Sequence, residues 1–338
     1  MPLASLAFLT LLAAPKNGPI LLLTNRGVRD GEWMRDARKD GYHLYTLKEP
    51  KSKWPPTLGL NPQKDFTAQN GTLNHYAGQL LNLGKANGGN LIFYVHGFNS
   101  SVRDAVGTIS KIREEMQDRG VRGTFVAISW PSDKRPERYN QDLGDSRSSG
   151  EAFAPFLVAL EDQIKSYKGV KTTLITHSMG GQFITRACRA RNNGQMVVNP
   201  PLDEIVLTAP DLDRSDLNVD KFGVDCVQVA KHLTCYFSDQ DFALGGSGLF
   251  RGTTGGRLGS QGPQDYDNLP DGILIVNGSR DIKPGRNPIG LGVSHFAYFD
   301  NDTFLDDLAC LIAGGEFKKG SREKVNEWLV RLRRVKTP

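Results

Sequence analysis

Short runs of apolar residues alternate along this chain with longer stretches in which apolar residues recur every three or four positions. Runs of that length, rich in Val, Ile and Leu, are typical of strands that are buried on both faces. The run at 42–47 fits this pattern less well than the others. The predicted strands are residues 19–24, 42–47, 91–97, 124–130, 172–178, 204–210, 233–238 and 272–278.

Amphipathic stretches between and after these runs predict the helices. In one of them Val102, Val106, Ile109 and Met116 recur at helical spacing. The region 49–89 is rich in Pro, Gly, Asn and Lys, so we expect a long loop there with one short helix. The predicted helices are residues 76–83, 102–116, 153–164 with Pro155 in its first turn, 179–191, 304–312 and 321–335.

Buried strands separated by amphipathic helices predict a doubly wound α/β fold, with a mostly parallel sheet and helices on both of its faces. We expect residues 19–338 to form a single domain of this class, because 338 residues and an apolar fraction of 38% suffice for one large core. Ligands bind such sheets at the carboxyl ends of the strands. The residues at those ends therefore carry the information about function.

The N-terminal residues 1–18 form a separate apolar segment. The run from Leu3 to Ala14 is too short to span a bilayer, and Pro15 ends it. It lacks a clear basic start and a clear small-x-small cleavage site, so a packing segment competes with a signal peptide. We expect a cytoplasmic protein without a transmembrane segment, with a secreted or periplasmic location as the alternative.

Charge and cysteine content weigh against several classes of function. The formal charge of +5 is mild, and the basic residues near the C-terminus fit a solvated helix face better than a nucleic-acid surface. The four cysteines lack CxxC spacing, which favours buried, reduced thiols. No HExxH motif occurs, and the acidic cluster at 300–307 lacks the glycine of a calcium loop. We therefore expect no metal, no cofactor and no nucleic-acid partner.

Polar residues gather after the predicted strands. They are His96 and Asn99, Ser132, Ser178, Asp211, Asp239 and Asp241, and His295. The segment 176–180 (THSMG) joins a strand to a helix with Ser178 at its apex, like the nucleophile elbow G-x-S-x-G with Thr176 in place of the first glycine. Gly180 and Gly181 provide the small residues that such a tight turn needs. A serine that only caps the following helix would not explain that glycine pair.

A serine nucleophile needs a base and an acid that orients the base. His295 follows the last strand and is the predicted base, whereas His96 and His177 are expected to position the loop after residue 97 and the elbow. For the acid, Asp241 lies just past the strand that ends at Ser238. Asp211 and Asp239 are the alternatives.

An oxyanion hole needs two backbone N–H groups that point at the developing charge. The residue after the nucleophile, Met179, is predicted to supply one of them. Phe98, in the loop after the strand 91–97, is predicted to supply the other, and Gly97 would let that backbone come close.

The segment 243–262 holds eight glycines but does not connect a strand to a helix N-terminus, so a phosphate cradle is a weak interpretation. We expect a mobile flap beside the site, with irregular linkage as the alternative. Phe242, Leu249 and Phe250 are its candidate apolar contacts to substrate.

Several motifs together resemble one known family. They are TNR at 24–26, FYVHGFN at 93–99, ISWPS at 128–132 with Tyr139 and Asp142 downstream, THSMGG at 176–181, LTAPDLD at 207–213, YFSDQDFAL at 236–244, and SHFAYF followed by FLDDL at 294–308. The combination is similar to a bacterial α/β-hydrolase family that carries only a domain-of-unknown-function label. The resemblance covers about residues 19–313. It implies the α/β-hydrolase fold, with Ser178 as nucleophile and with Asp241 and His295 as acid and base.

These observations favour a serine hydrolase that cleaves a small-molecule carboxylic ester through an acyl-enzyme. Two other classes are open: a non-catalytic α/β-hydrolase scaffold, and an acyltransferase that uses an acceptor other than water. A scaffold has no need to keep Ser, His and both glycines. Labelling by a fluorophosphonate probe separates an enzyme from a scaffold.

Overall fold

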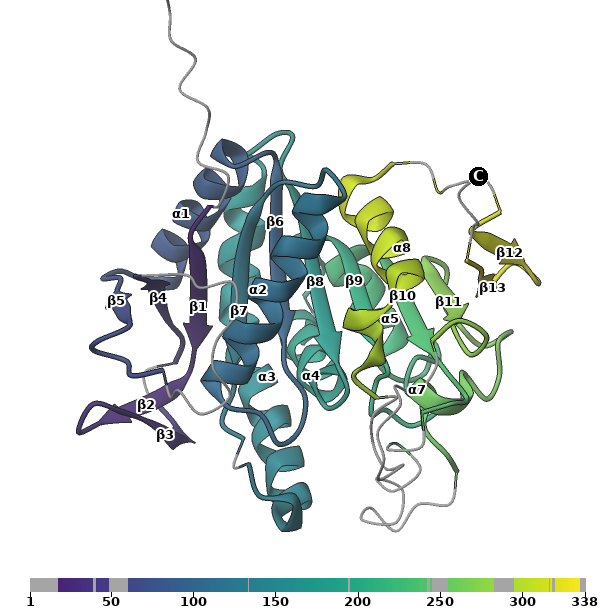
Figure 1. Ribbon diagram of the computed structural model, residues 1–338, viewed down its shortest axis with the longest axis horizontal. Coiled ribbons are helices and arrows are strands. Elements are labelled where there is room, and N and C mark those ends of the chain that lie inside the picture. Colours follow the sequence, from purple (N-terminus) through teal and green to yellow (C-terminus); the bar gives the residue numbers. More distant parts are fainter. Residues whose placement is uncertain are drawn as a thin grey trace, which may run out of the picture.

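The computed structural model describes residues 18–38, 41–48, 60–132, 134–193, 195–241, 244, 255–282, 295–315, 317 and 320–334. A large sheet runs through the middle of these residues, with helices on both sides (Figure 1). Its strands, from one edge to the other, are β12, β13, β11, β10, β9, β8, β6, β7, β1, β4 and β5. Neighbours from β1 to β13 pair in parallel, while β4, β5 and β12 pair antiparallel at the edges.

The strands of this sheet are β1 Ile20–Thr24, β4 His43–Leu47, β5 Phe66–Ala68, β6 Asn90–Val95, β7 Thr124–Ser129, β8 Lys171–His177, β9 Leu202–Thr208, β10 Ala230–Phe237, β11 Ile273–Asn277, β12 Arg322–Lys324 and β13 Leu329–Leu332. A separate hairpin joins β2 Arg26–Arg29 to β3 Glu32–Ala37. The order of the central strands matches the doubly wound class that the apolar runs predict.

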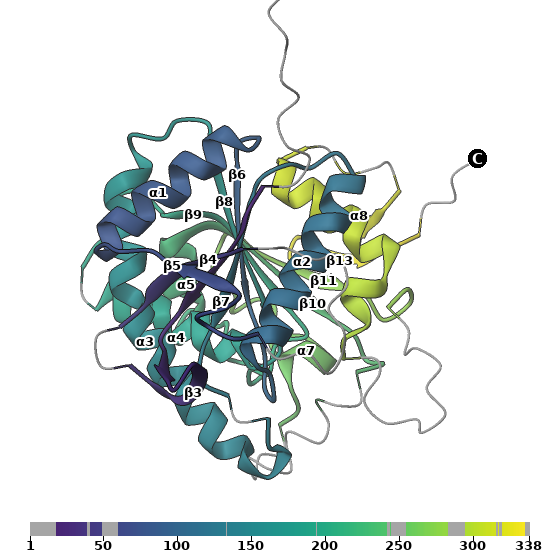
Figure 2. The same ribbon diagram turned by 60° about the vertical axis from the view of Figure 1, so that its left-hand side comes forward.

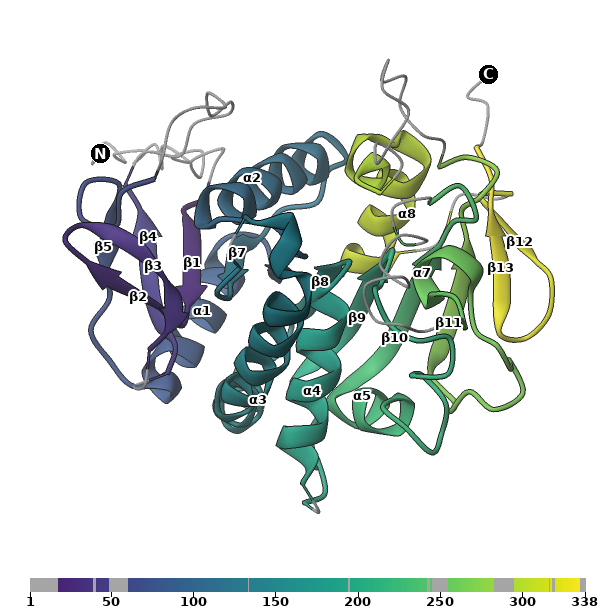
Figure 3. The same ribbon diagram turned by 90° about the horizontal axis from the view of Figure 1, so that it is seen from below.

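The helices are α1 Leu73–Ala86, α2 Val102–Asp118, α3 Tyr139–Ile164, α4 Gly180–Asn192, α5 Gly223–Val229, α7 Leu258–Gln261 and α8 Asp302–Ala313, with 3-10 turns η1 Pro136–Arg138 and η2 Ala297–Asp300. Figures 2 and 3 show that α1, α3, α4 and α5 cover one face of the sheet and that α2 and α8 cover the other. No helix of the described residues is long and apolar enough to cross a bilayer.

Each central strand contributes to two apolar cores because successive side chains point to opposite faces. In β1, Leu21 and Leu23 pack in the core on the side of α3 and α4, while Ile20 and Leu22 pack in the core on the side of α2 and α8. All four side chains are at most 1% exposed. Because both faces of the sheet are buried, a ligand can reach the sheet only at the ends of its strands.

Two predictions about elements are wrong. The helix predicted at 321–335 is absent from its described part, residues 321–334: β12 and β13 lie there, and β13 pairs with the edge of β11. The helix expected from residue 153 begins at Tyr139, so Pro155 lies in its interior rather than in its first turn. Its first half is buried mainly through small or polar residues such as Ser146, Ser149 and Gly150, which apolar spacing cannot detect. The elements β2, β3, β5, α5 and α7 had no prediction.

Candidate active site

Ser178 occupies a sharp turn between β8 and α4. Its φ of +55° is a left-handed conformation that a residue with a Cβ adopts at a cost of about 1–3 kcal/mol. Three backbone hydrogen bonds hold it. The Ser178 N–H donates to the Thr208 carbonyl at 3.0 Å, and the Ser178 carbonyl accepts from Gly181 and Asp211, each at 3.0 Å. The neighbouring strand and loop therefore fix the serine in this turn.

The glycines of this region are explained by close contacts. A Cβ on Gly97 would lie 2.8 Å from the Ser178 Cβ, and one on Gly180 would lie 2.8 Å from the Val95 carbonyl oxygen. Such distances are too short for any larger residue. Thr176 stands in place of the usual first glycine and faces Gly180. Even a Cβ on Gly180 would lie 3.4 Å from the Thr176 Cβ, an ordinary contact distance, so the threonine fits beside the turn. The turn thus forms despite the departure at Thr176.

His295 and Asp241 come together from segments that are 54 residues apart. The His295 Nδ1 lies 2.7 Å from the Asp241 Oδ2, and both residues are buried. A carboxylate can only accept, so Nδ1 carries the proton in this pair and Nε2 of a neutral imidazole can accept one. The Asp241 backbone N–H is fixed in turn by the Ser238 carbonyl at 3.0 Å.

His177 connects this pair to the serine turn. Its Nε2 donates to the His295 carbonyl oxygen at 2.8 Å, and the two imidazole centroids are 4.5 Å apart. Burial, with the nearby His295 as the second cause, lowers the His177 pKa well below its ordinary value, so the ring is neutral. Within the described residues, no hydrogen bond joins Ser178 to His295. Such bonds are often long in hydrolases without substrate.

The loop 97–100, which we call the oxyanion loop, carries the predicted donor Phe98. Neither the Phe98 N–H nor the Met179 N–H donates a hydrogen bond inside the part of the chain that the structure describes. Asn99 has a φ of +58°, so this loop is also strained. The Phe98 ring packs edge-on against Tyr139 with centroids 5.2 Å apart.

His96 supports the oxyanion loop. The Trp130 N–H donates to His96 Nε2 at 3.2 Å, which leaves Nδ1–H to donate to the Gly97 carbonyl at 2.8 Å. Burial and then the charge of Arg26 lower the His96 pKa to about 3. The ring therefore stays neutral and keeps one donor and one acceptor, as the expected positioning role requires.

The two alternative acids have other environments. Asp211 is buried, accepts from the Tyr139 hydroxyl and forms an ion pair with Arg257, whose Nε is 3.4 Å from its Oδ1. Asp239 is exposed. From the sequence, Tyr139 was named only as part of the family motifs, without being placed beside Asp211, and Arg257 was not named, because no short-range pattern links either residue to Asp211.

The glycine-rich segment 243–262 is described only in part. Phe242, Leu249 and Phe250 lie outside the described residues. Its last part is packed rather than flap-like, because Arg257 is 1% exposed and α7 follows it. A Cβ on Gly259 would lie 2.4 Å from the Ala209 carbonyl carbon. The idea of one continuous flap is therefore wrong for residues 257–262.

A cavity of about 730 Å³ lies beside the oxyanion loop, on the face of the sheet that α2 covers. His96, Asn99 and Ser100 line it beside Phe296, a residue that is 55% exposed and whose ring lies 5.6 Å from that of His295. Its remaining wall carries charges of both signs, from Arg103, Asp104, Lys111, Glu114, Glu115 and Lys134. Charged side chains of both signs therefore surround this cavity beside His96 and Phe296.

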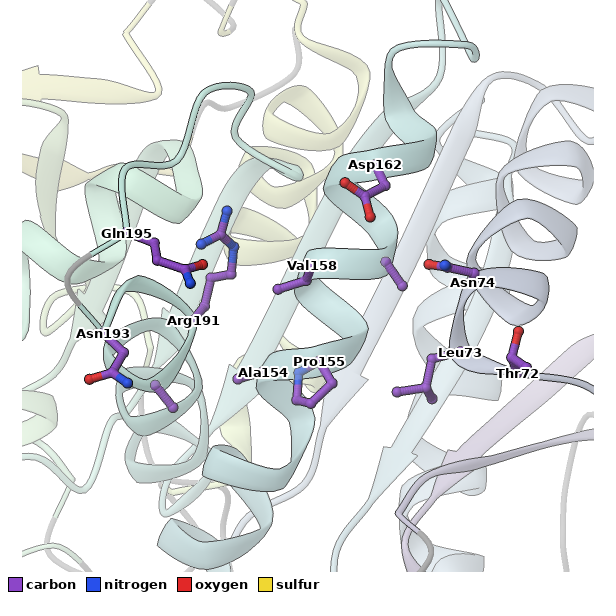
Figure 4. A pocket seen from close by; sticks show the side chains of 12 residues that line it. Thr72, Leu73, Asn74, Ala154, Pro155, Val158, Asp162, Arg191, Asn193 and Gln195 are labelled. Carbon is purple, nitrogen blue, oxygen red and sulfur yellow. The ribbon is translucent and has the colours of Figure 1, made fainter.

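A second hollow, a groove of about 600 Å³, lies over α1, α3 and α4 (Figure 4). Leu73, Pro155 and Val158 form apolar parts of it, and Asp162 and Arg191 contribute charge. Among the described residues that line this groove, none belongs to the serine turn, the oxyanion loop or the His295–Asp241 pair. Within the described residues, no three His, Cys, Asp or Glu side chains form a group that could hold a metal ion.

The model of a family described as "Alpha/beta hydrolase of unknown function (DUF900)" matches residues 78–279. No curated protein matches the chain. A structural similarity to LpqC, a poly(3-hydroxybutyrate) depolymerase from Bordetella parapertussis, has a TM-score of 0.43 and 13% identity, over 83% of this chain and 87% of that one.

Two further similarities are weaker. An acetylxylan esterase has a TM-score of 0.34 and 10% identity, over 66% of this chain and 96% of that one. The cutinase of Trichoderma reesei has a TM-score of 0.26 and 15% identity, over 41% of this chain and 61% of that one. Similarities at this level say nothing about the substrate of this protein.

Proposed function

We propose that the protein, which belongs to the family of alpha/beta hydrolases of unknown function, is a serine hydrolase that acts on carboxylic esters. Ser178 is the nucleophile, His295 the general base and Asp241 the acid. The observation that carries the proposal is the 2.7 Å contact between His295 and Asp241, next to a strained serine turn.

In the first half of the reaction the Ser178 Oγ attacks the ester carbonyl carbon while its proton passes to the His295 Nε2. Asp241 stabilises the resulting imidazolium through the proton on Nδ1. The carbonyl electron pair moves onto the oxygen, which the N–H groups of Phe98 and Met179 stabilise. When the tetrahedral intermediate collapses, the alkoxide leaves with the proton from Nε2, and an acyl-Ser178 ester is left.

In the second half a water molecule takes the place of the alcohol. His295 accepts a proton from this water as it attacks the acyl carbon, and it then returns the proton to the Ser178 Oγ as the carboxylic acid departs. The neutral state of His177 fits this cycle, because a second positive ring beside His295 would disfavour the imidazolium.

The proposal is tested by labelling and by mutation of the nucleophile. Ser178→Ala should abolish hydrolysis of p-nitrophenyl acetate, with a loss in kcat on the order of 10⁶-fold where a full triad operates. A fluorophosphonate probe should label the wild-type protein on the peptide that contains Ser178 and should not label the variant.

Ser148→Ala is the matched control, because Ser148 is exposed on α3 and its hydroxyl donates only to the Gly144 carbonyl within its own helix. It should keep full activity and labelling. Activity of the Ser178 variant within tenfold of wild type, with the fold intact, would exclude Ser178 as nucleophile.

A further inference from the structure

Arg26 is a buried cation at the carboxyl edge of the sheet. It begins β2, directly after the β1 strand and Asn25, and is 3% exposed. The Thr24 hydroxyl fixes this corner by donating to the Ser129 carbonyl at 2.6 Å and by accepting the Arg26 N–H at 3.1 Å. Nothing in the reaction proposed above uses this side chain, although burying a guanidinium is expensive unless its donors are satisfied.

The Arg26 guanidinium bridges the segment that follows β6 to the last residue of β7 and to the segment after it. Its Nη2 donates to the Ser100 carbonyl at 3.0 Å and its Nε donates to the Ser129 hydroxyl at 3.1 Å. Both terminal nitrogens lie 3.4 Å from the Ser132 carbonyl oxygen. The planar fork of arginine can satisfy these acceptors together, which a lysine ammonium cannot do from one position.

These contacts fix the end of the oxyanion loop from both sides. The Ser100 carbonyl accepts from Arg26, and the Ser100 N–H donates to the Ser132 hydroxyl at 3.1 Å. That hydroxyl donates in turn to Asp142, a buried residue of α3. Asn99, whose φ is +58°, lies directly before this fixed residue, so the anchor at Ser100 restrains the backbone next to Phe98.

The start of the same loop is linked to Arg26 through Ser129. The Ser129 hydroxyl accepts from the Arg26 Nε and lies 3.2 Å from the His96 Nε2, to which it can donate. The His96 Nδ1–H donates to the Gly97 carbonyl, while burial and then the charge of Arg26 keep Nε2 unprotonated, so that it accepts from the Trp130 backbone N–H. One side chain thereby supports both ends of a four-residue segment that contains Phe98.

We propose that Arg26 is the positioning residue of the oxyanion loop: it holds the Phe98 N–H in the place where it stabilises the tetrahedral intermediate. This inference rests on the proposed function. Removal of one oxyanion donor costs about 10²–10³-fold in kcat, so displacing that donor should cost tens- to a hundredfold. The substrate ground state makes little use of the donor, so KM should change far less.

The experiment compares Arg26→Lys and Arg26→Gln with wild type, using p-nitrophenyl acetate and an arylboronic acid. We expect both variants to lose about 10- to 100-fold in kcat, with KM within about threefold. The inhibition constant of the boronic acid, whose tetrahedral adduct occupies the oxyanion hole, should rise by a similar factor. The kcat values are calculated from the concentration of protein that a fluorophosphonate labels to completion, so that unfolded protein is excluded from the enzyme concentration.

Arg113→Gln is the matched control. Arg113 is also 3% exposed and donates to a backbone carbonyl, that of Gly18 at 3.1 Å. Gly18 precedes β1, so this contact lies at the amino ends of the strands, away from the serine turn. It should lower the melting temperature and leave kcat and boronate affinity unchanged.

Three outcomes would overturn the role of Arg26. They are wild-type kcat in Arg26→Lys, a kcat loss without a matching loss of boronate affinity, and an equal kcat loss in Arg113→Gln. If Arg26→Gln does not fold, Arg26→Lys decides between these results. Failure of the proposed function is recognised separately, since Ser178→Ala would then retain activity.

Discussion

At the scale of single residues, Asp241 and Asp211 show how the partners of a buried carboxylate determine its role. Both are buried carboxylates that follow a parallel strand. Asp241 accepts from His295, whereas Asp211 accepts from Tyr139 and pairs with Arg257. The first contact can set the tautomer of a base, and the second connects the loop after β9 to α3 and to the residue before α7. Their roles should therefore separate under mutation.

Asp241→Asn should lower kcat by about 10⁴-fold and leave stability nearly unchanged, because the amide favours the wrong imidazole tautomer. Asp211→Asn should do the reverse. It should lose up to about 3 kcal/mol of stability, since it weakens a buried ion pair, and keep kcat within about tenfold. Ester hydrolysis and urea unfolding of both variants measure this. The opposite ranking of kcat, with both proteins folded, would transfer the acid role to Asp211.

At the scale of elements, α3 and α4 pack unusually closely beside the serine turn. Gly150 makes this possible, because a Cβ there would lie 2.1 Å from the Phe183 carbonyl oxygen of α4. The Ser146 hydroxyl adds a hydrogen bond to the Met179 carbonyl at 3.0 Å. Since α4 begins two residues after Ser178, the position of α3 contributes to the geometry of the turn.

Gly150→Ala should destabilise the protein by about 1–3 kcal/mol, because the helices must move apart. Gly144→Ala is the control on the same helix. A Cβ at Gly144 would meet nothing within 4 Å, so this change should stabilise the protein by up to about 1 kcal/mol through helix propensity. Thermal unfolding of the two variants measures the difference. Equal effects would show that the helix contact does not limit stability.

At the scale of the whole molecule, the buried neutral histidines make folding sensitive to acid. The His96 pKa is about 3 in the folded protein, below the ordinary 6.5 of the unfolded chain. The unfolded state therefore takes up a proton first as the pH falls below about 6.5, and stability is lost from there towards pH 3. His177 adds a contribution of the same sign. Buried Glu204, whose pKa is raised to about 7, contributes with the opposite sign.

The contribution of His96 is isolated by comparison with His96→Gln, which keeps a donor and an acceptor but does not titrate. Between pH 7 and pH 5 the wild-type protein should lose about 2 kcal/mol more unfolding free energy than the variant. Urea unfolding at several pH values measures this. Parallel curves for the two proteins would contradict a buried, neutral His96.

The positions of the central strands and the serine turn could be predicted from the sequence, and the reason is local. Strands buried on both faces need unbroken apolar runs, and a tight turn beneath a neighbouring strand needs glycine at 180. Both demands act within a few residues. The sequence favoured Asp241 among three candidate acids but left Asp211 and Asp239 open, and the structure places the Asp241 Oδ2 2.7 Å from the His295 Nδ1.

Other features were decided only by the tertiary structure, because they depend on partners distant in the chain. Apolar residues in 321–335 recur at helical spacing, but β13 forms there instead, because its backbone pairs with the edge of β11. The first half of α3 is buried through small residues that matter only against α4. Arg26 meets the oxyanion loop 74 residues away along the chain, through hydrogen bonds to backbone carbonyls, and every residue type has such carbonyls. A contact of that kind leaves no pattern in the sequence.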